Sequence, residues 1–284
     1  MQRIHRVGRI VALIALPLLL LAACGDRTDD LEPAAQPSTS EGPSFSTLED
    51  GVLKVGSCLD YKPFEFVKAG DEMGFDVELT EELAKRMGGL EVQWVTANFD
   101  TIFTSVAADQ FDMVAAAATI LPERQDVVDF SDPYFNSRQG FTTNTSATPD
   151  ITSIDDLKEG DVVGVQKGTT GKAYAEENLV SKGVEIKTFE TAPDAFTDLE
   201  AGNIVGVVND EGSSIAEAES RPDLEVVQAI DTEEKYGFAF SKENPELTAA
   251  ADEALAAIIA DGTYASIFTK WFPDLPVPEE YKAS

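Results

Sequence analysis

The stretch AATILPERQDVVDFSDPY, from Ala117 to Tyr134, decides how the rest of this chain is interpreted. It directly follows an apolar run over residues 111–116, which we predict to be a buried strand. Thr119 and Arg124 follow that strand, on either side of a turn that begins at a proline. Carbonyl and hydroxyl oxygens accept hydrogen bonds from an ammonium group, and a planar guanidinium holds a carboxylate through two parallel bonds. The stretch therefore suits the binding of a small zwitterion.

The N-terminus has the pattern of an export signal. Three arginines lie among the first nine residues, and an apolar run follows over residues 10–21, which is too short for a membrane span. The run ends in LAACG, a sequence similar to a bacterial lipobox, whose cysteine is here Cys24. We therefore predict a lipoprotein signal peptide over residues 1–23 and lipidation of Cys24, for example with palmitate, which would hold the protein on the outer face of the cell membrane. A plain secretory signal with an incidental cysteine is the alternative.

A tether and two lobes are expected after the signal. Residues 24–50 are rich in Pro, Ser, Thr, Ala and acidic residues, and such a composition cannot bury enough apolar surface to offset its ordering entropy. We predict this segment to be a flexible tether. The rest is long enough for a sizeable core, and we expect lobe 1 to comprise residues 51–143 and 237–284, and lobe 2 residues 144–236.

The charge balance excludes several kinds of partner. The chain has 21 Lys and Arg against 52 Asp and Glu, and the residues after Cys24 carry a formal net charge of −34, because three basic and no acidic residues precede it. Nucleic acid and anionic lipid both need basic protein surface, so we expect neither to bind electrostatically. Cys58 is the only other cysteine, so no intrachain disulfide is expected once Cys24 is lipidated.

The sequence also argues against catalysis. Its single histidine, His5, lies in the predicted signal peptide, which excludes Ser-His and Cys-His nucleophiles and His-containing zinc sites from the mature chain. Neither a dinucleotide-binding nor a P-loop glycine pattern is present. We therefore predict no catalytic residue, no metal and no cofactor.

Strand and helix patterns alternate along the chain, which predicts an α/β fold with mixed, mostly parallel sheets. The expected strands include residues 52–56, 91–95, 111–116, 162–165, 184–188 and 204–208. The expected helices include one capped by Asp76, one over 99–108, one over 172–178, one over 193–201, a short one capped by Ser153, and two over 245–260 and 263–271. Two connecting strands, near residues 140–143 and 236–240, are expected to form a hinge.

Two further features place polar groups near strand ends. The sequence QKGTTG, residues 166–171, is a glycine-rich turn that enters a helix, and backbone N–H groups at such a start can hold an anion. Asp210 lies just beyond the strand that ends at residue 208, and ligands of open α/β sheets gather at these carboxyl ends.

In combination, these motifs resemble the family 3 extracellular solute-binding proteins, the polar amino-acid receptors of bacterial ABC importers. Besides the opening stretch, the resemblance is carried by YKPFEF (61–66), GFDV (74–77), NFD (98–100), GTTG (168–171) and VVND (207–210), in that order. It covers residues 51–275. It implies a two-lobed fold of the type II periplasmic-binding-protein class, with a two-strand hinge.

The resemblance also implies a set of ligand-binding residues. The α-carboxylate would be bound by Arg124, with help from the turn at Thr169 and Thr170. The α-ammonium would be bound by the Ala117 carbonyl, the Thr119 hydroxyl and the Asp210 carboxylate. The ligand would lie between the side chains of Tyr61 and Phe99.

Specificity for the ligand side chain is less determined. Many relatives have an aspartate, which often binds a distal cation, at the position of Cys58. Asn209 and Gln166 are neutral and could contact an amide or a second carboxylate. We therefore favour glutamine, glutamate or cystine as the ligand.

The expected function is that of a monomeric, membrane-anchored lipoprotein on the extracytoplasmic side, which captures an amino acid and delivers it to an ABC permease. A fold-related periplasmic dehydratase or lyase and a ligand-sensing surface lipoprotein are the alternatives.

Overall fold

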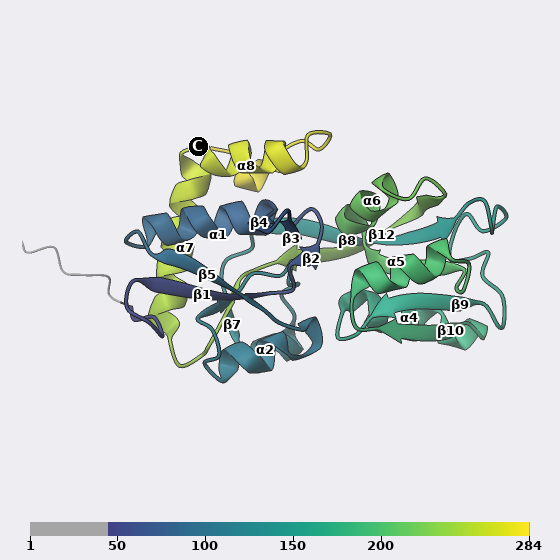
Figure 1. Cartoon of the computed structure of the whole chain (residues 1–284), viewed down its shortest axis with the longest axis horizontal. Coiled ribbons are helices and arrows are strands. Elements are labelled where there is room, and N and C mark those ends of the chain that lie inside the picture. The colour runs from purple at the N-terminus through teal and green to yellow at the C-terminus, as the bar shows by residue number, and fades with distance from the viewer. Residues whose placement is uncertain (1–44, 284) are drawn as a thin grey trace, which may run out of the picture. The chain divides into compact units, whose positions relative to one another are not determined.

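The computed structural model describes residues 45–283 (Figure 1). The predicted signal peptide, Cys24 and most of the predicted tether lie outside these residues. In the described part, no helix combines the length and apolar composition that crossing a bilayer would require.

The first sheet has five strands in the order β5-β1-β6-β13-β7. Its strands are β1 (Val52–Ser57), β5 (Glu91–Thr96), β6 (Met113–Val114), β7 (Asp129–Phe130) and β13 (Ala239–Phe240). The helices that accompany it are α1 (Phe75–Arg86), α2 (Phe99–Ala107), α3 (Pro122–Gln125), α7 (Pro245–Ala260) and α8 (Thr263–Trp271). Figure 1 shows α1 and α2 on opposite sides of this sheet, which buries β1 residues such as Leu53 and Val55 completely.

The second sheet also has five strands, in the order β10-β9-β11-β8-β12. Its strands are β8 (Phe135–Asn144), β9 (Val162–Gln166), β10 (Glu185–Phe189), β11 (Gly206–Asp210) and β12 (Leu224–Tyr236). Its helices are α4 (Thr170–Asn178), α5 (Ala192–Glu200) and α6 (Glu211–Glu219), with a 3-10 turn η1 (Val180–Lys182).

Each large sheet has two parallel and two antiparallel pairings, so the prediction of mixed sheets is confirmed, although parallel pairs do not predominate. A small antiparallel sheet of β2 (Asp60–Tyr61), β3 (Glu65–Lys68) and β4 (Asp71–Met73) follows β1, and η2 (Glu279–Tyr281) lies near the C-terminus. The two C-terminal helices, α7 and α8, have the predicted bounds.

The chain passes between the large sheets twice, after β7 and after β12. The prediction of a hinge strand at residues 140–143 is wrong, because this segment pairs with both β11 and β12 inside the second sheet. β8 is buried continuously from Gln139 to Asn144, so its sequence has no alternation that would indicate where the sheet begins. The lobe boundaries at residues 143 and 237 stay predictions. At the first crossing, the chain enters the second sheet at Phe135, earlier than residue 143; at the second crossing, it leaves that sheet after Tyr236.

Two predicted helix starts differ from the structure. α1 begins at Phe75 after Gly74, and Asp76 is a buried residue of the first turn with no capping role. Gly74 has φ 138°, and a Cβ there would lie 1.9 Å from the Phe64 carbonyl oxygen, so only glycine fits. The short helix expected after Ser153 is absent, because the Asp156 carboxylate accepts the backbone N–H groups of that segment and closes a turn.

Candidate ligand-binding site

A cavity lies among loops and helices next to the first sheet, the small sheet, and strands and a helix start of the second sheet. Its lining consists of Cys58, Tyr61, Glu65, Phe99, Ala116, Ala117, Thr119, Arg124, Gln166, Thr169, Thr170 and Asp210. Nine of the ten residues predicted to bind the ligand are in this set; Asn209 is the exception.

Arg124 in α3 is almost completely buried at the edge of the cavity. Its Nη1 donates to the Thr119 carbonyl oxygen at 2.7 Å and its Nη2 to the Gly168 carbonyl oxygen at 3.1 Å. Its guanidinium lies 5.2 Å from the ring centre of Phe99 and 4.7 Å from that of Phe103. The two rings and two carbonyls fix the orientation of the guanidinium, while these two bonds use only two of its five N–H groups.

Burial lowers the pKa of Arg124, and the nearby carboxylates of Asp210 and Glu234 act in the opposite direction. An arginine has a very high ordinary pKa, so Arg124 remains a cation. A carboxylate that entered the cavity would therefore meet a positive charge with free N–H donors.

Asp210 is the last residue of β11 and accepts three hydrogen bonds. The hydroxyls of Tyr61 and Tyr236 donate to Oδ2 at 2.9 and 2.6 Å, and Gln139 Nε2 donates to Oδ1. Burial, followed by repulsion from Glu234, raises the pKa of Asp210 to about 6, while the three hydrogen bonds oppose the rise. An ammonium group in the cavity would favour the ionised form of this carboxyl.

Thr119 is oriented by a residue that the sequence analysis did not single out. Its hydroxyl donates to Glu234 Oε2 at 2.7 Å, and both groups are buried. Because the hydroxyl proton is engaged there, the remaining interaction of the Thr119 oxygen is as an acceptor. Gln139 Nε2 also donates to Glu234, at 2.9 Å, so the Asp210 and Glu234 carboxylates are joined through one amide.

Ala117 adopts a left-handed conformation with φ 45°, which is unusual for a residue with a Cβ. Its backbone N–H donates to the buried Asp76 Oδ2 at 2.8 Å, and the Tyr134 hydroxyl donates to the same oxygen at 2.7 Å. Since β6 ends at Val114, the strained turn at Ala117 belongs to the exit from the strand. Strained backbone held by several bonds is common at binding sites.

The second sheet contributes the start of α4 to the cavity. Thr169 is the N-cap of α4, and its hydroxyl accepts from the Lys172 N–H at 3.2 Å and donates to the Gln166 carbonyl oxygen at 2.8 Å. The Gln166 side chain donates to the Glu190 carbonyl oxygen at 3.2 Å. Asn209 lies outside the lining, and its Oδ1 lies 3.0 Å from the Tyr61 hydroxyl oxygen, whose single proton it shares with Asp210 Oδ2. Asn209 therefore holds Tyr61 in place and does not face the cavity.

Contacts between the sheets close the cavity. Besides the bonds of Tyr61 and Arg124, Lys167 Nζ lies 3.0 Å from Asp100 Oδ2. Gly168 lies so close to Asp100 that a Cβ would be 2.9 Å from its Cα. The structure is therefore of a closed form.

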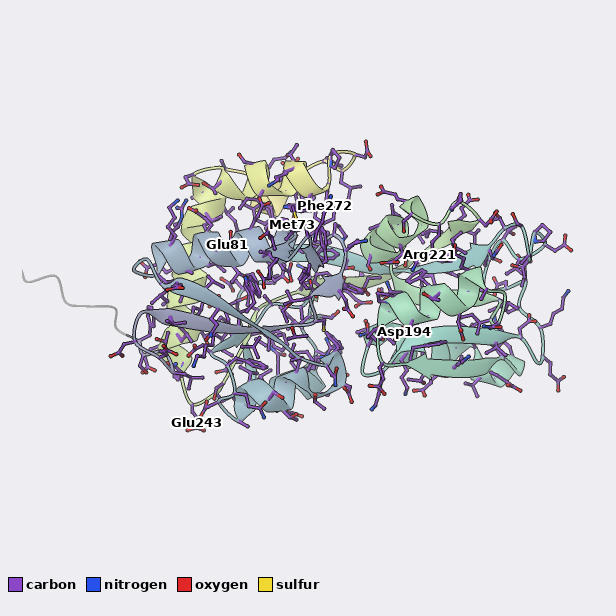
Figure 2. All side chains as sticks on the ribbon, in the orientation of Figure 1. Met73, Glu81, Asp194, Arg221, Glu243 and Phe272 are labelled. Carbon is purple, nitrogen blue, oxygen red and sulfur yellow. The ribbon has the colours of Figure 1, made fainter. Side chains whose placement is uncertain are left out.

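Glu65 and Ala116 line the cavity although neither was among the predicted ligand-binding residues, and Cys58, which stands where many relatives have an acid, lines it as well. Glu65 is a charged residue between two phenylalanines in YKPFEF, and a charge inside an aromatic run was the available signal. Nearby Asp60 is also acidic: burial, and then repulsion from Asp194 and Glu217 of the second sheet's helices, raises its pKa to about 6. Figure 2 labels Asp194 at the start of α5.

The model of the bacterial extracellular solute-binding proteins, family 3, matches residues 53–274. The lysine/arginine/ornithine-binding periplasmic protein of Escherichia coli (strain K12) is 31% identical over 238 residues, covering 81% of this chain and 90% of that protein. The L-cystine-binding protein TcyJ of the same strain is 31% identical over 236 residues, covering 82% and 86%.

A solved structure is also similar. It is that of an ancestral amino acid-binding protein, named as a precursor of cyclohexadienyl dehydratase, with a TM-score of 0.71 and 36% identity, covering 78% of this chain and 95% of that one. Its similarity and that of the family confirm the predicted two-lobed α/β fold.

Proposed function

Because the chain belongs to the bacterial extracellular solute-binding proteins, family 3, we propose that it binds one polar amino acid in the described cavity and delivers it to the permease of an ABC importer. One observation carries this proposal: Arg124 and Asp210 line the same cavity. A buried cation and a buried anion at one site match the two charged ends of an amino-acid backbone. Two relatives named for the amino acids they bind support the same class of ligand.

In the proposed complex, free N–H groups of Arg124 bind the α-carboxylate, together with the groups at the start of α4. The α-ammonium donates to Asp210, to the Thr119 hydroxyl and to the Ala117 carbonyl. The orientation of the Thr119 hydroxyl as an acceptor supports this assignment. Tyr61 and Phe99 contact the ligand with their rings, and Gln166 lies beside it.

Binding and closure are proposed to be coupled. The Arg124 bond to Gly168 and the Lys167–Asp100 ion pair connect the two sheets in the closed form. A ligand that contacts groups on both sheets binds the closed form more tightly and shifts the population toward it. The closed form would then dock on the permease as a monomer.

A binding assay with a matched control tests this function. Thermal-shift measurements against all common amino acids, followed by calorimetry, should identify a ligand that raises the melting temperature of the wild type. Arg124→Ala should lower the affinity for that ligand by at least about 30-fold, since one partner of a buried charge pair is removed. Arg138→Ala is the control, because Arg138 forms an exposed ion pair with Glu211 outside the cavity. Equal affinity of Arg124→Ala and the wild type would contradict the proposed site.

We propose binding without catalysis. The relatives named above are binding proteins, and the single histidine of the chain is at position 5, outside the described residues. Mass spectrometry after long incubation should recover the bound amino acid unchanged. A converted product would instead support the alternative of a fold-related enzyme, for which the dehydratase lineage of one structural neighbour is the reason.

We also propose that Cys24 is lipidated and anchors the protein to the cell membrane. The support is the sequence LAACG after an apolar run. Cys24→Ser should move the protein from the membrane fraction into the soluble extracytoplasmic fraction. Retention of that variant in the membrane would contradict the anchor.

A further inference from the structure

Glu65 lines the cavity, and no group of the described residues forms a hydrogen bond with its carboxyl oxygens. Its exposed fraction is 0%, and among residues 45–283 neither of its carboxyl oxygens has a hydrogen-bond partner. Asp210, the other acidic residue of the lining, accepts three bonds. Buried polar groups are nearly always hydrogen-bonded, and an isolated buried carboxylate is costly. A partner for Glu65 is therefore expected from the contents of the cavity.

The surroundings of Glu65 are acidic or neutral. Burial raises the pKa of Glu65 well above its ordinary value, and repulsion from Asp76, Asp60 and Asp210 raises it further. Burial and the same kind of repulsion raise the pKa of the Cys58 thiol, which is consequently neutral. This part of the cavity thus favours a positive charge.

The position of Glu65 is set by the small sheet. It begins β3 and is paired across the ladder with Tyr61 of β2, whose hydroxyl donates to Asp210. Glu65 is thereby held on the same scaffold as a residue that reaches the proposed ammonium site. A strand residue with a fixed cross-strand neighbour has little freedom to leave the cavity.

The charges of the lining indicate which ligand fits. Arg124 is its one basic residue, and Asp210 and Glu65 are its two acidic residues. The backbone of an amino acid has one carboxylate for Arg124 and one ammonium for Asp210, which leaves Glu65 without a counter-charge. We propose that Glu65 binds the side-chain cation of a basic amino acid, such as arginine, lysine or ornithine. This inference rests on the proposed function, because it requires the ligand backbone to occupy Arg124 and Asp210.

The inference replaces the expectation of glutamine, glutamate or cystine. That expectation depended on Cys58, which stands where many relatives have an acid, but the same cavity has a carboxyl at Glu65. The second carboxylate of a bound glutamate would be repelled there. A neutral amide could hydrogen-bond to the neutral carboxyl of Glu65, but only a cation would stabilise its ionised form.

The test compares L-arginine with L-citrulline, its uncharged counterpart of nearly equal shape. Calorimetry at pH 7.5 should show that the wild type binds L-arginine at least about 30-fold more tightly than L-citrulline, as expected for a buried charge pair. In Glu65→Gln the two affinities should become equal to within about threefold, chiefly through loss of L-arginine affinity. L-lysine with L-norleucine gives the same comparison for an ammonium side chain.

Proton release gives a second readout. Because burial and nearby carboxylates raise the pKa of Glu65 in the empty cavity, and a cation beside it would favour the ionised form, L-arginine binding should release protons from Glu65 to the buffer. Repeating the titration in buffers of different ionisation enthalpy should show a proton release in the wild type that is much smaller in Glu65→Gln. A purely structural role of Glu65 would leave this release unchanged.

A control variant on the same small sheet and a comparison of wild-type affinities distinguish failure of the inference from failure of the proposed function. Glu72→Gln makes the same change on exposed β4 of the same small sheet, and it should keep the wild-type preference. Tighter binding of a neutral or acidic amino acid than of any basic one by the wild type would overturn the inference while leaving the proposed function intact. This comparison needs no variant, so it holds even if Glu65→Gln fails to fold. Absence of binding to every amino acid would instead overturn the proposed function.

Discussion

Replacement of Asp210 by asparagine is the most direct test of how the cavity binds an ammonium group. The side chain keeps its size, but the negative charge is removed. Tyr61 and Tyr236 can still donate to the amide oxygen, whereas the amide nitrogen cannot accept the bond that Gln139 Nε2 donates to Oδ1. The change therefore removes the charge of Asp210 together with one of its three hydrogen bonds.

The expected loss of ligand affinity in Asp210→Asn follows from the loss of one buried ion pair. Two unit charges about 4 Å apart at an effective dielectric constant of about 20 attract each other by about 4 kcal/mol. Truncation of one partner of such a pair costs about 2–5 kcal/mol. We expect the dissociation constant of the tightest-binding amino acid to rise by about 30- to 5,000-fold at pH 7.5.

The pH dependence has a definite sign. The pKa of Asp210 is raised from 3.8 to about 6 in the empty protein, so the carboxyl is mostly protonated below pH 6. An ammonium ligand needs the ionised form, and binding to the wild type must weaken as the pH falls below 6. The affinity ratio of wild type to Asp210→Asn should therefore shrink by about tenfold between pH 7.5 and pH 5.

The empty protein should respond in the opposite direction. A folded-state pKa above the unfolded value stabilises the fold below about pH 4, and this stability is lost as the pH rises through 6. The rise from 3.8 to about 6 corresponds to ~3 kcal/mol at pH 8. Ligand-free Asp210→Asn should consequently be more stable to urea than the wild type at pH 8, with a smaller difference at pH 4.

The assay is calorimetry for binding and urea unfolding for stability, on ligand-free protein. Glu211→Gln is the matched control, because Glu211 is the next residue and pairs with exposed Arg138. The control should bind as the wild type does. An Asp210→Asn variant with wild-type affinity at pH 7.5, or equally tight wild-type binding of the α-keto analogue of the ligand, would refute the assignment of the ammonium to Asp210.

Two further predictions concern other residues. Gly74→Ala should destabilise the fold by more than about 2 kcal/mol in urea unfolding, because its φ is 138° and the new Cβ would meet the Phe64 carbonyl; Gly70→Ala, with φ 97° and open space around it, should cost only about 1 kcal/mol. Thr119→Val should weaken amino-acid binding by about tenfold, since an acceptor for the ammonium is lost, whereas Thr119→Ser should stay within about threefold. Equal stability of the two glycine variants, or equal binding by the valine and serine variants, would contradict these expectations.

The sequence by itself was sufficient for the α/β order of elements and the bounds of the last two helices. These features depend on local signals. Apolar periodicity marks helices such as Pro245–Ala260, and the turn after the strand at Met113–Val114 brings Thr119 and Arg124 close together in the chain. The motif resemblance then indicated which distant segments meet, and all eight residues that it assigned to the ligand line one cavity.

The tertiary structure alone decided the features that depend on long-range pairing. Residues 140–143 belong to the second sheet because β8 pairs with β11 and β12, and its continuous burial hides that register from the sequence. Asn209 bonds to Tyr61 from 148 positions away, so its sequence position beside Asp210 did not reveal that it lies outside the lining. Whether the carboxyl of Glu65 is solvated, paired or buried without a partner is determined only by the residues that fold around it, since the same local sequence is compatible with all three.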